Sequence, residues 1–146
     1  ENPAHNDGIW EITVNSPREE LGASYATLSV SNTTISTSGD YEQYYEIGGT
    51  RYCHIIGRDG MPVGAGSHVL CATVVGGSAA AGDARATALV AMTEEEAVAY
   101  ASAHADEFRV MFVWYDAAED SYALYTNLDE ESYELTASFD RVEVFS

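Results

Sequence analysis

Residues 108–115 read Phe-Arg-Val-Met-Phe-Val-Trp-Tyr, an apolar run with a single charged residue. β-branched and aromatic side chains favour strands, and apolar residues at both odd and even positions are typical of a strand that is buried on both faces. A polar turn at residues 116–120 separates this run from residues 122–126, Tyr-Ala-Leu-Tyr-Thr. We therefore expect an antiparallel pair of strands at the centre of a sheet.

Further strand-like segments lie on both sides of this pair. Alternation of apolar and polar residues predicts strands with one solvent-facing side, and short apolar runs predict buried strands. The expected strands are residues 10–14, 26–30, 41–47, 52–56, 69–75, 85–92, 108–115, 122–126 and 133–144. The predicted fold class is mostly β, with α+β as the alternative. Its architecture is an antiparallel sandwich or curled barrel of about eight or nine strands.

One late α-helix is expected to begin at Thr93. Thr93 and Glu96 form the pattern of a capping box, and acidic residues in the first turn are favoured by the helix dipole. The alanine-rich stripe at residues 97–105 favours close packing of this helix on a sheet.

The chain has the length of one domain, 146 residues. Residues 1–8 show no periodicity and are expected to form an N-terminal arm. No repeat or composition break divides residues 9–146, which predicts a single β-rich domain. Near its end the apolar positions change from odd to even numbers, which predicts a β-bulge near Asp140 and Arg141.

The charge balance is strongly acidic, with 24 Asp and Glu against six Arg, no Lys and a formal net charge of −18. Nucleic acid is excluded as a partner, because neutralising phosphates requires basic side chains. Weak binding of cations to this surface is expected. Three origins of the acidity stay open: a genome rich in G and C, adaptation to high salt, or a surface that captures cations or a basic partner.

The N-terminal residue and the cysteines favour an extracellular location. The sequence begins with Glu1 and contains no apolar run of the roughly 18 to 20 residues that a membrane-spanning helix needs. A removed signal peptide accounts for both features. We expect an extracellular or surface-displayed protein, released by removal of an N-terminal segment.

The two cysteines are expected to form a disulfide. If residues 52–56 and 69–75 pair as a hairpin centred on Pro62, Cys53 lies directly opposite Cys71. That spacing suits a cross-strand disulfide, and an even number of cysteines is typical of secreted domains. The alternative is a pair of buried free thiols.

His54 and His68 lie on the opposite face of the same expected hairpin. As diagonal neighbours they would be within reach of one metal ion or one substrate, which makes them candidate catalytic acid–base residues or metal ligands. A third ligand would come from Asp59 or Asp83. The alternative interpretation is that both are ordinary hydrogen-bonded histidines.

A turn that contains Asp116, Glu119 and Asp120 is a candidate site for a hard cation. The spacing does not match the loop that pre-positions oxygen ligands around calcium, so a simple solvated turn is the alternative.

Asn32 begins the tripeptide Asn-Thr-Thr, an acceptor motif for N-glycosylation. The surrounding stretch is polar and expected to be exposed. Glycosylation at Asn32 is therefore a candidate modification.

No complete catalytic motif is present. Residues 64–67 lack the Lys-Ser/Thr ending of a phosphate-binding loop, and there is no Gly-x-Ser-x-Gly sequence. We therefore expect no cofactor and a noncatalytic β-domain that acts through contacts with a protein partner or through self-assembly, as an assembly subunit, coat component or binding module. The alternatives are a small enzyme with a histidine-based site and a small-molecule carrier.

Salt is expected to stabilise this protein, because its charges are nearly all of one sign. The repulsion between exposed acids is screened over about 10 Å at 0.1 M ionic strength. A thermal scan at low and at molar NaCl measures the effect, and the melting temperature should rise with salt. A flat or falling melting temperature would contradict adaptation to high salt.

Overall fold

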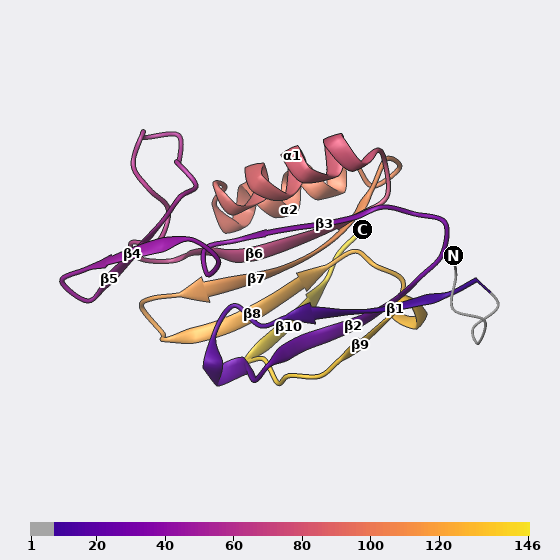
Figure 1. Cartoon of the computed structure of the whole chain (residues 1–146), viewed down its shortest axis with the longest axis horizontal. Helices are drawn as coiled ribbons and strands as arrows, with labels where there is room; N and C mark the ends of the chain where they lie inside the picture. Colours follow the sequence, from indigo (N-terminus) through magenta and orange to yellow (C-terminus); the bar gives the residue numbers. More distant parts are fainter. Residues whose placement is uncertain (1–7) are drawn as a thin grey trace.

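The computed structural model describes residues 8–146, which form three stacked layers (Figure 1). A three-stranded sheet and a five-stranded sheet lie face to face, and two helices cover the far side of the five-stranded sheet. A separate two-stranded hairpin projects from one end. The mostly β fold class expected from the sequence is confirmed. The expected N-terminal arm, residues 1–8, falls outside the described residues except for Gly8.

The strands are β1 (Trp10–Asn15), β2 (Ser24–Val30), β3 (Ile35–Gly39), β4 (Tyr44–Ile47), β5 (Thr50–Cys53), β6 (His68–Val75), β7 (Arg109–Asp116), β8 (Ser121–Thr126), β9 (Tyr133–Leu135) and β10 (Arg141–Val144). The helices are α1 (Ala79–Val90) and α2 (Glu94–Ala103), with short 3-10 turns η1 (Glu19–Leu21) and η2 (Glu130–Ser132). Among residues 8–146, no helix is long and apolar enough to cross a membrane.

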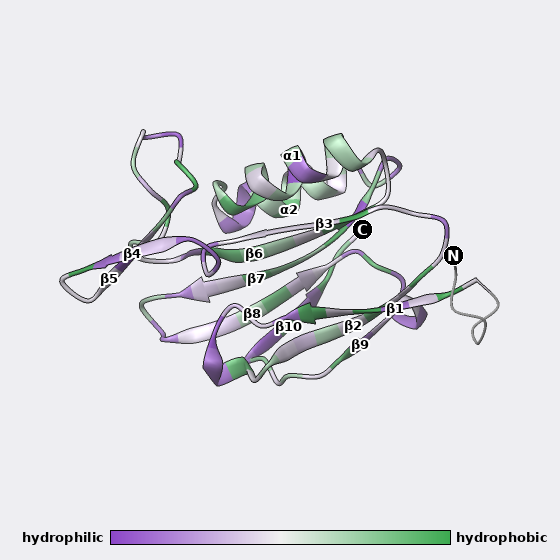
Figure 2. Ribbon diagram, viewed as in Figure 1, coloured by the Kyte–Doolittle hydropathy of each residue, from purple (hydrophilic) through white to green (hydrophobic). Residues whose placement is uncertain are grey.

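β6 and β7 form the centre of the five-stranded sheet, whose order is β10-β8-β7-β6-β3. Every β6 residue from His68 to Val74 is buried, and Figure 2 shows the apolar colour along this strand. The expected antiparallel pair is confirmed, because Phe112 of β7 lies opposite Tyr125 of β8. β10 is an exception to the expected antiparallel order, since it runs parallel to β8.

The five-stranded sheet has a hydrophobic core on each face. One core lies against β1 and β2 of the three-stranded sheet, and the other lies against α1 and α2. Fully buried side chains of the first core are Tyr25, Leu28, Leu70, Met111 and Leu124, and those of the second are Val69, Val74, Leu89, Val110 and Phe112. Both faces of the central strands are therefore dry.

Residues 85–92 were expected to be a strand, and that prediction is wrong because they belong to α1 and the turn that follows it. The Ser78 side chain caps the helix by accepting a hydrogen bond from the Ala81 backbone N–H. Six of the twelve residues of α1 are alanine, which has the highest helix propensity. The alternation of small apolar residues was therefore a misleading strand signal.

The expected strand at residues 133–144 is two strands in different sheets, and the predicted β-bulge near Asp140 and Arg141 is wrong. β9 pairs with β2 in the three-stranded sheet, whereas β10 pairs with β8 in the five-stranded sheet. The chain crosses between the sheets at Asp140, whose N–H donates to the Tyr122 carbonyl oxygen. The change from odd to even apolar positions marks this crossing, because each strand directs its own apolar set toward the core.

The expected pairing of residues 52–56 with 69–75 does not occur. β5 pairs with β4, and β6 lies between β3 and β7. Cys53 and Cys71 therefore belong to different hydrophobic cores, and both are buried free thiols. The predicted disulfide is wrong in this structure, because the hairpin on which it depended is not formed.

The β4–β5 hairpin and the loop after it project from the body (Figure 1), and both carry exposed apolar side chains. Tyr45 is 79% exposed and Ile47 is 68% exposed. Ile56 and Met61 continue this surface beyond β5. The projecting hairpin and the loop after it therefore hold five of the exposed large apolar side chains of residues 8–146: Tyr44, Tyr45, Ile47, Ile56 and Met61.

Alkylation without reductant tests the state of the cysteines. Both thiols should be labelled in denatured protein, as two mass additions. Native protein should label slowly at Cys71, because burial raises the pKa of that thiol to about 12 and leaves little thiolate. Unlabelled denatured protein that gains two labels only after reduction would restore the disulfide.

Candidate functional site

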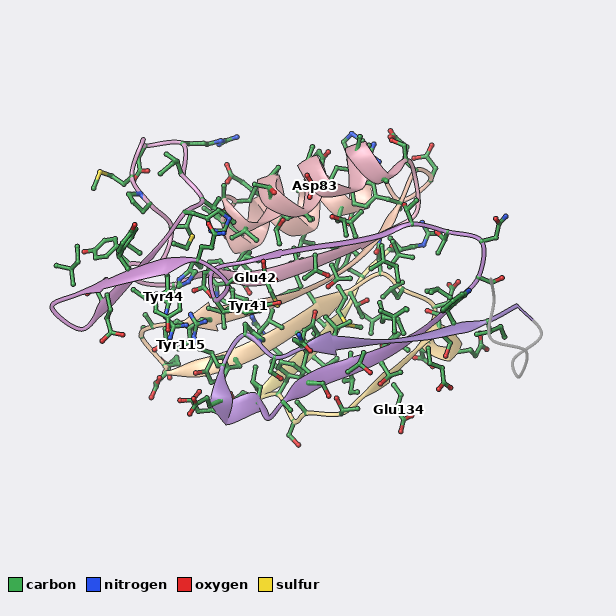
Figure 3. The ribbon with its side chains drawn as sticks, viewed as in Figure 1. Tyr41, Glu42, Tyr44, Asp83, Tyr115 and Glu134 are labelled. Carbon is green, nitrogen blue, oxygen red and sulfur yellow. The ribbon has the colours of Figure 1, made fainter. Side chains whose placement is uncertain are left out.

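Charged and hydrogen-bonded side chains gather where β3 ends and the chain turns into the projecting hairpin. Figure 3 shows Tyr41, Tyr44 and Tyr115 at this end of the molecule. Gly39 closes β3, and a Cβ there would lie 2.4 Å from the Tyr41 ring and 3.1 Å from the Cys71 Cβ. Only glycine therefore lets the Tyr41 ring fold over the end of the strand, where burial raises its pKa to about 12.

Asp40 follows Gly39 and is fully buried, yet its carboxylate is paired on both oxygens. Arg18, from the segment after β1, donates to Asp40 Oδ1 at 2.7 Å and to Oδ2 at 2.5 Å. His68 Nε2 lies 2.8 Å from Oδ2. Burial alone would raise the pKa of Asp40, but the hydrogen bonds and charges of Arg18 and His68 outweigh it and hold that pKa below its ordinary value.

His54 is exposed and has a defined ring orientation. Its backbone N–H donates to the Gln43 carbonyl oxygen at 3.1 Å, and its ring Nδ1 lies 3.2 Å from the same oxygen. A carbonyl oxygen can only accept, so in the neutral ring Nδ1 carries the hydrogen and Nε2 keeps the lone pair. His54, Glu42, Tyr44 and Tyr45 line an open hollow of about 450 Å³.

The structure does not bring His54 and His68 together as one site. His54 lines the hollow beside β4, whereas His68 is bound to Asp40 and lines a different hollow, next to Tyr115. Within residues 8–146, no three His, Cys, Asp or Glu side chains are grouped so as to hold a metal ion. The predicted histidine pair therefore separates into one buried structural histidine and one exposed histidine.

A second set of polar groups follows the seam between β3 and α1. Ser36 donates to Asp83 Oδ1 at 3.4 Å, and the Ser38 and Thr87 hydroxyls are 2.9 Å apart. α1 lies close to β3 here, because a Cβ on Gly82 would be in van der Waals contact with the Ser36 Cβ at 3.6 Å. Ser36 and Ser38 lie on β3, which ends directly before Asp40. The seam between β3 and α1 therefore extends toward the base of the hairpin.

The seam can offer oxygen ligands to a hard cation. Asp83 is exposed and supplies one carboxylate, and the neighbouring Thr87 supplies a hydroxyl one helical turn away. Magnesium is commonly held by one or two carboxylates together with substrate phosphates, and not by a cage of protein ligands alone. One carboxylate and one hydroxyl would leave positions on such an ion for ligands that do not come from the protein. Figure 3 labels Asp83 on α1.

The predicted cation site at Asp116, Glu119 and Asp120 is a hydrogen-bonded turn. Asp116 Oδ1 accepts from the Ala118 backbone N–H at 2.9 Å, and Asp120 Oδ1 accepts from the Tyr115 hydroxyl at 2.9 Å. Its carboxylates are thus partly used by the turn itself.

Asn32 is exposed between β2 and β3, with a positive φ of 47°. Its glycosylation stays a prediction.

Most of the site was not identified from the sequence. Arg18 and Asp40 are 22 residues apart, and neither belongs to a recognisable motif. Asp83 was considered only as a third ligand for the two histidines, whereas its actual neighbour is Ser36. One usable signal was the sequence Gly39-Asp40, because Gly and Asp favour turns and functional residues are often found on loops.

The chain matches known proteins over most of its length. The model of the ApbE family matches residues 2–112. The FAD:protein FMN transferase of Vibrio cholerae is 34% identical over 102 residues, which cover 68% of this chain and 30% of that protein. The FAD:protein FMN transferase of Escherichia coli K12 is 32% identical over 89 residues, 60% of this chain and 25% of that protein. The chain belongs to the ApbE family.

Solved structures share this fold. The ApbE protein of Thermotoga maritima superposes with a TM-score of 0.63 over 83% of this chain and 37% of its own, at 23% identity, which shows the fold alone. The apo flavinyl transferase ApbE of Pseudomonas stutzeri gives 0.55 over 88% of this chain and 34% of its own, at 25% identity. A histidine-to-glycine mutant of the Vibrio cholerae flavin transferase gives 0.57 over 88% of this chain and 35% of its own, at 27% identity.

The family membership corrects the function expected from the sequence. The prediction of a noncatalytic protein that acts as a structural or binding domain is wrong, because the relatives are named as transferases. The chain spans 30% and 25% of the length of the two relatives given above. The complete activity of those proteins is therefore a proposal for this chain.

Replacing Asp40 with Asn should destabilise the fold at pH 7 by about 3 kcal/mol, because Arg18 and His68 lose their buried counter-charge. The pKa of Asp40 is lower in the folded chain than in the unfolded one. Its contribution is therefore complete above the unfolded pKa of about 3.9 and is lost as the pH falls through the folded value. Urea unfolding at pH 7 and at lower pH should show the gap between parent and variant narrowing. The exposed Asp106→Asn change is the control, and a gap that is equal at all pH values would contradict the assignment.

Proposed function

We propose that this chain forms part of the catalytic apparatus of an FAD:protein FMN transferase. The observation that supports it most is the family match over residues 2–112, which includes the end of β3, the hairpin and the β3–α1 seam. A polar seam that leads to an exposed histidine suits a reaction between a phosphorylated substrate and a second molecule.

The proposed reaction is a phosphoryl-type transfer. FAD contains FMN and AMP joined through a pyrophosphate. A nucleophilic oxygen of the acceptor protein attacks the phosphorus on the FMN side, a new P–O bond forms, and the bridging P–O bond breaks so that AMP leaves. The acceptor gives up one proton. Such reactions depend mainly on positioning and on stabilisation of charge.

His54 is the candidate general base for that proton. Its Nδ1–H is held by the Gln43 carbonyl oxygen, so the Nε2 lone pair is available on an exposed ring. A general base must reach the proton that it abstracts, and an exposed histidine beside an open hollow meets that condition more readily than the buried His68.

Asp83 and Thr87 are the candidate ligands of a divalent cation that accompanies the FAD pyrophosphate. A chain with a net charge of −18 repels a phosphate group unless a cation lies between them. When bound, such an ion would neutralise charge on the phosphates. Ser36 and Ser38 hold the two ligands through their hydroxyl groups.

The acceptor protein is proposed to meet the projecting hairpin. Tyr44 and Tyr45 line the same hollow as His54, and Tyr45 is the most exposed large apolar side chain of the described residues. Aromatic side chains are enriched in protein interfaces, because they bury a large area at a low cost in conformational entropy.

A flavin-transfer assay tests the proposal. The chain is incubated with FAD, Mg²⁺ and a protein that the Vibrio cholerae transferase flavinylates, with that transferase as the positive control. Covalent flavin is then read as in-gel fluorescence, and AMP by chromatography. A second arm replaces the matching segment of the Vibrio cholerae transferase by this chain, because the chain spans 30% of that relative. Transfer in either arm supports the proposal, and no transfer in both overturns it.

Variants of whichever arm is active assign the roles. His54→Gln should lower the transfer rate by about 10²- to 10⁴-fold, the usual contribution of a general base. Asp83→Asn should weaken the dependence on Mg²⁺. His104→Gln is the matched control, since His104 closes α2 and its Nδ1 contacts the Tyr100 carbonyl oxygen. Equal loss in His54→Gln and His104→Gln would contradict a catalytic role for His54.

A further inference from the structure

The buried carboxylate of Asp40 joins three segments that are distant in sequence. Arg18 comes from the segment that follows β1, Asp40 from the end of β3, and His68 from the start of β6. Arg18 binds both carboxylate oxygens, which gives the bidentate geometry of a strong ion pair. The backbone immediately after Asp40 is thus anchored from two sides.

His68 strengthens this anchor with both ring nitrogens. Nδ1 lies 2.8 Å from the Gly66 carbonyl oxygen, and Nε2 lies 2.8 Å from Asp40 Oδ2. Neither oxygen can donate when Asp40 is ionised, and the bidentate contact with Arg18 favours the ionised form. Both ring nitrogens therefore face oxygen acceptors, and the two contacts tie Asp40 to the loop before β6.

The turn that Asp40 begins leads directly to the contact that orients His54. Only Tyr41 and Glu42 separate Asp40 from Gln43, whose carbonyl oxygen accepts from both the backbone N–H and the ring Nδ1 of His54. The ring of a histidine without such a partner exchanges between two neutral tautomers. The place of the Gln43 carbonyl therefore decides which nitrogen of His54 is free.

We propose that Asp40, together with Arg18 and His68, is a positioning residue that selects the His54 tautomer by holding the 40–43 turn. The cluster keeps the Gln43 carbonyl against His54 Nδ1 and leaves Nε2 free toward the hollow. Its meaning for catalysis rests on the proposed transferase function. The tautomer of His54 does not depend on that function, because it is observable without any substrate.

Nitrogen NMR of protein labelled with ¹⁵N in the histidine rings tests the proposal on the full chain. In the parent, the neutral form of His54 should show a protonated Nδ1 and an unprotonated Nε2. His68→Gln removes one anchor of Asp40 while keeping a polar side chain. We expect its His54 to show averaged shifts of two tautomers.

Several variants keep this experiment decisive. Arg18→Gln removes the bidentate ion pair with the same carboxylate. It should also give averaged shifts of two tautomers at His54. Asp40→Asn should give the largest change, and if it fails to fold the other two variants still test the proposal. His104→Gln assigns one set of signals and should leave those of His54 unchanged. A His54 that keeps the same single tautomer in folded His68→Gln and Arg18→Gln overturns the proposal.

Kinetics separate positioning from simple loss of structure. In an active transfer assay, His68→Gln should lower kcat by about 10- to 100-fold, as seen for residues that orient a functional ligand, while KM for FAD stays nearly constant. If the lower activity of His68→Gln is explained entirely by a smaller fraction of folded protein, the proposed role of Asp40 and His68 in catalysis is overturned. If the parent shows no transfer but the tautomer shifts as expected, the proposed function fails and the positioning role stands.

Discussion

Burial of β6 on both faces is the constraint on which the other layers depend. No side chain from His68 to Val74 reaches solvent to a significant extent, so both neighbouring layers must present apolar surfaces to the sheet. One layer is the three-stranded sheet, and the other consists of the two helices. Small residues of α1 let that helix lie close to the strands, and Gly82 shows this most directly. A central strand without a polar face thus determines a stack of three layers.

The same constraint explains where the charges lie. With 24 acidic residues in the chain, the dry cores leave the surface as the place for nearly all of them. Asp40 is the fully buried acid among residues 8–146, and it is compensated by Arg18 and His68. An ionised carboxylate is tolerated in the interior only when its oxygens are paired and hydrogen-bonded. This cluster marks the point where the core ends and the candidate site begins.

The candidate site lies at the border between the rigid sheet and the projecting hairpin. Asp83 and Thr87 belong to a helix that packs on the sheet, so their positions are set by the core. His54 directly follows the hairpin and is connected to the sheet through Gln43 and Asp40. A substrate that contacts both parts would meet rigid oxygen ligands on one side and an exposed, oriented histidine on the other. Transfer of a phosphorylated group requires such placement and charge stabilisation more than any short sequence motif. This is why the absence of a motif was a poor argument for a noncatalytic protein.

The amino-acid sequence by itself determined the mostly β fold class, the central strand pair at residues 108–115 and 122–126, the capped helix after Thr93 and the acidic surface. These features depend on local periodicity, propensity and composition, which are encoded within a few residues. Only the tertiary structure decided that β6 lies between β3 and β7, that the cysteines are apart, and that β9 and β10 belong to different sheets. Strand partners are chosen by burial across the whole molecule, and one strand pattern is compatible with many partners. For the same reason Arg18, Asp40 and His68 became one cluster only in the folded chain, because their contact depends on which strands are neighbours and not on their spacing in the sequence.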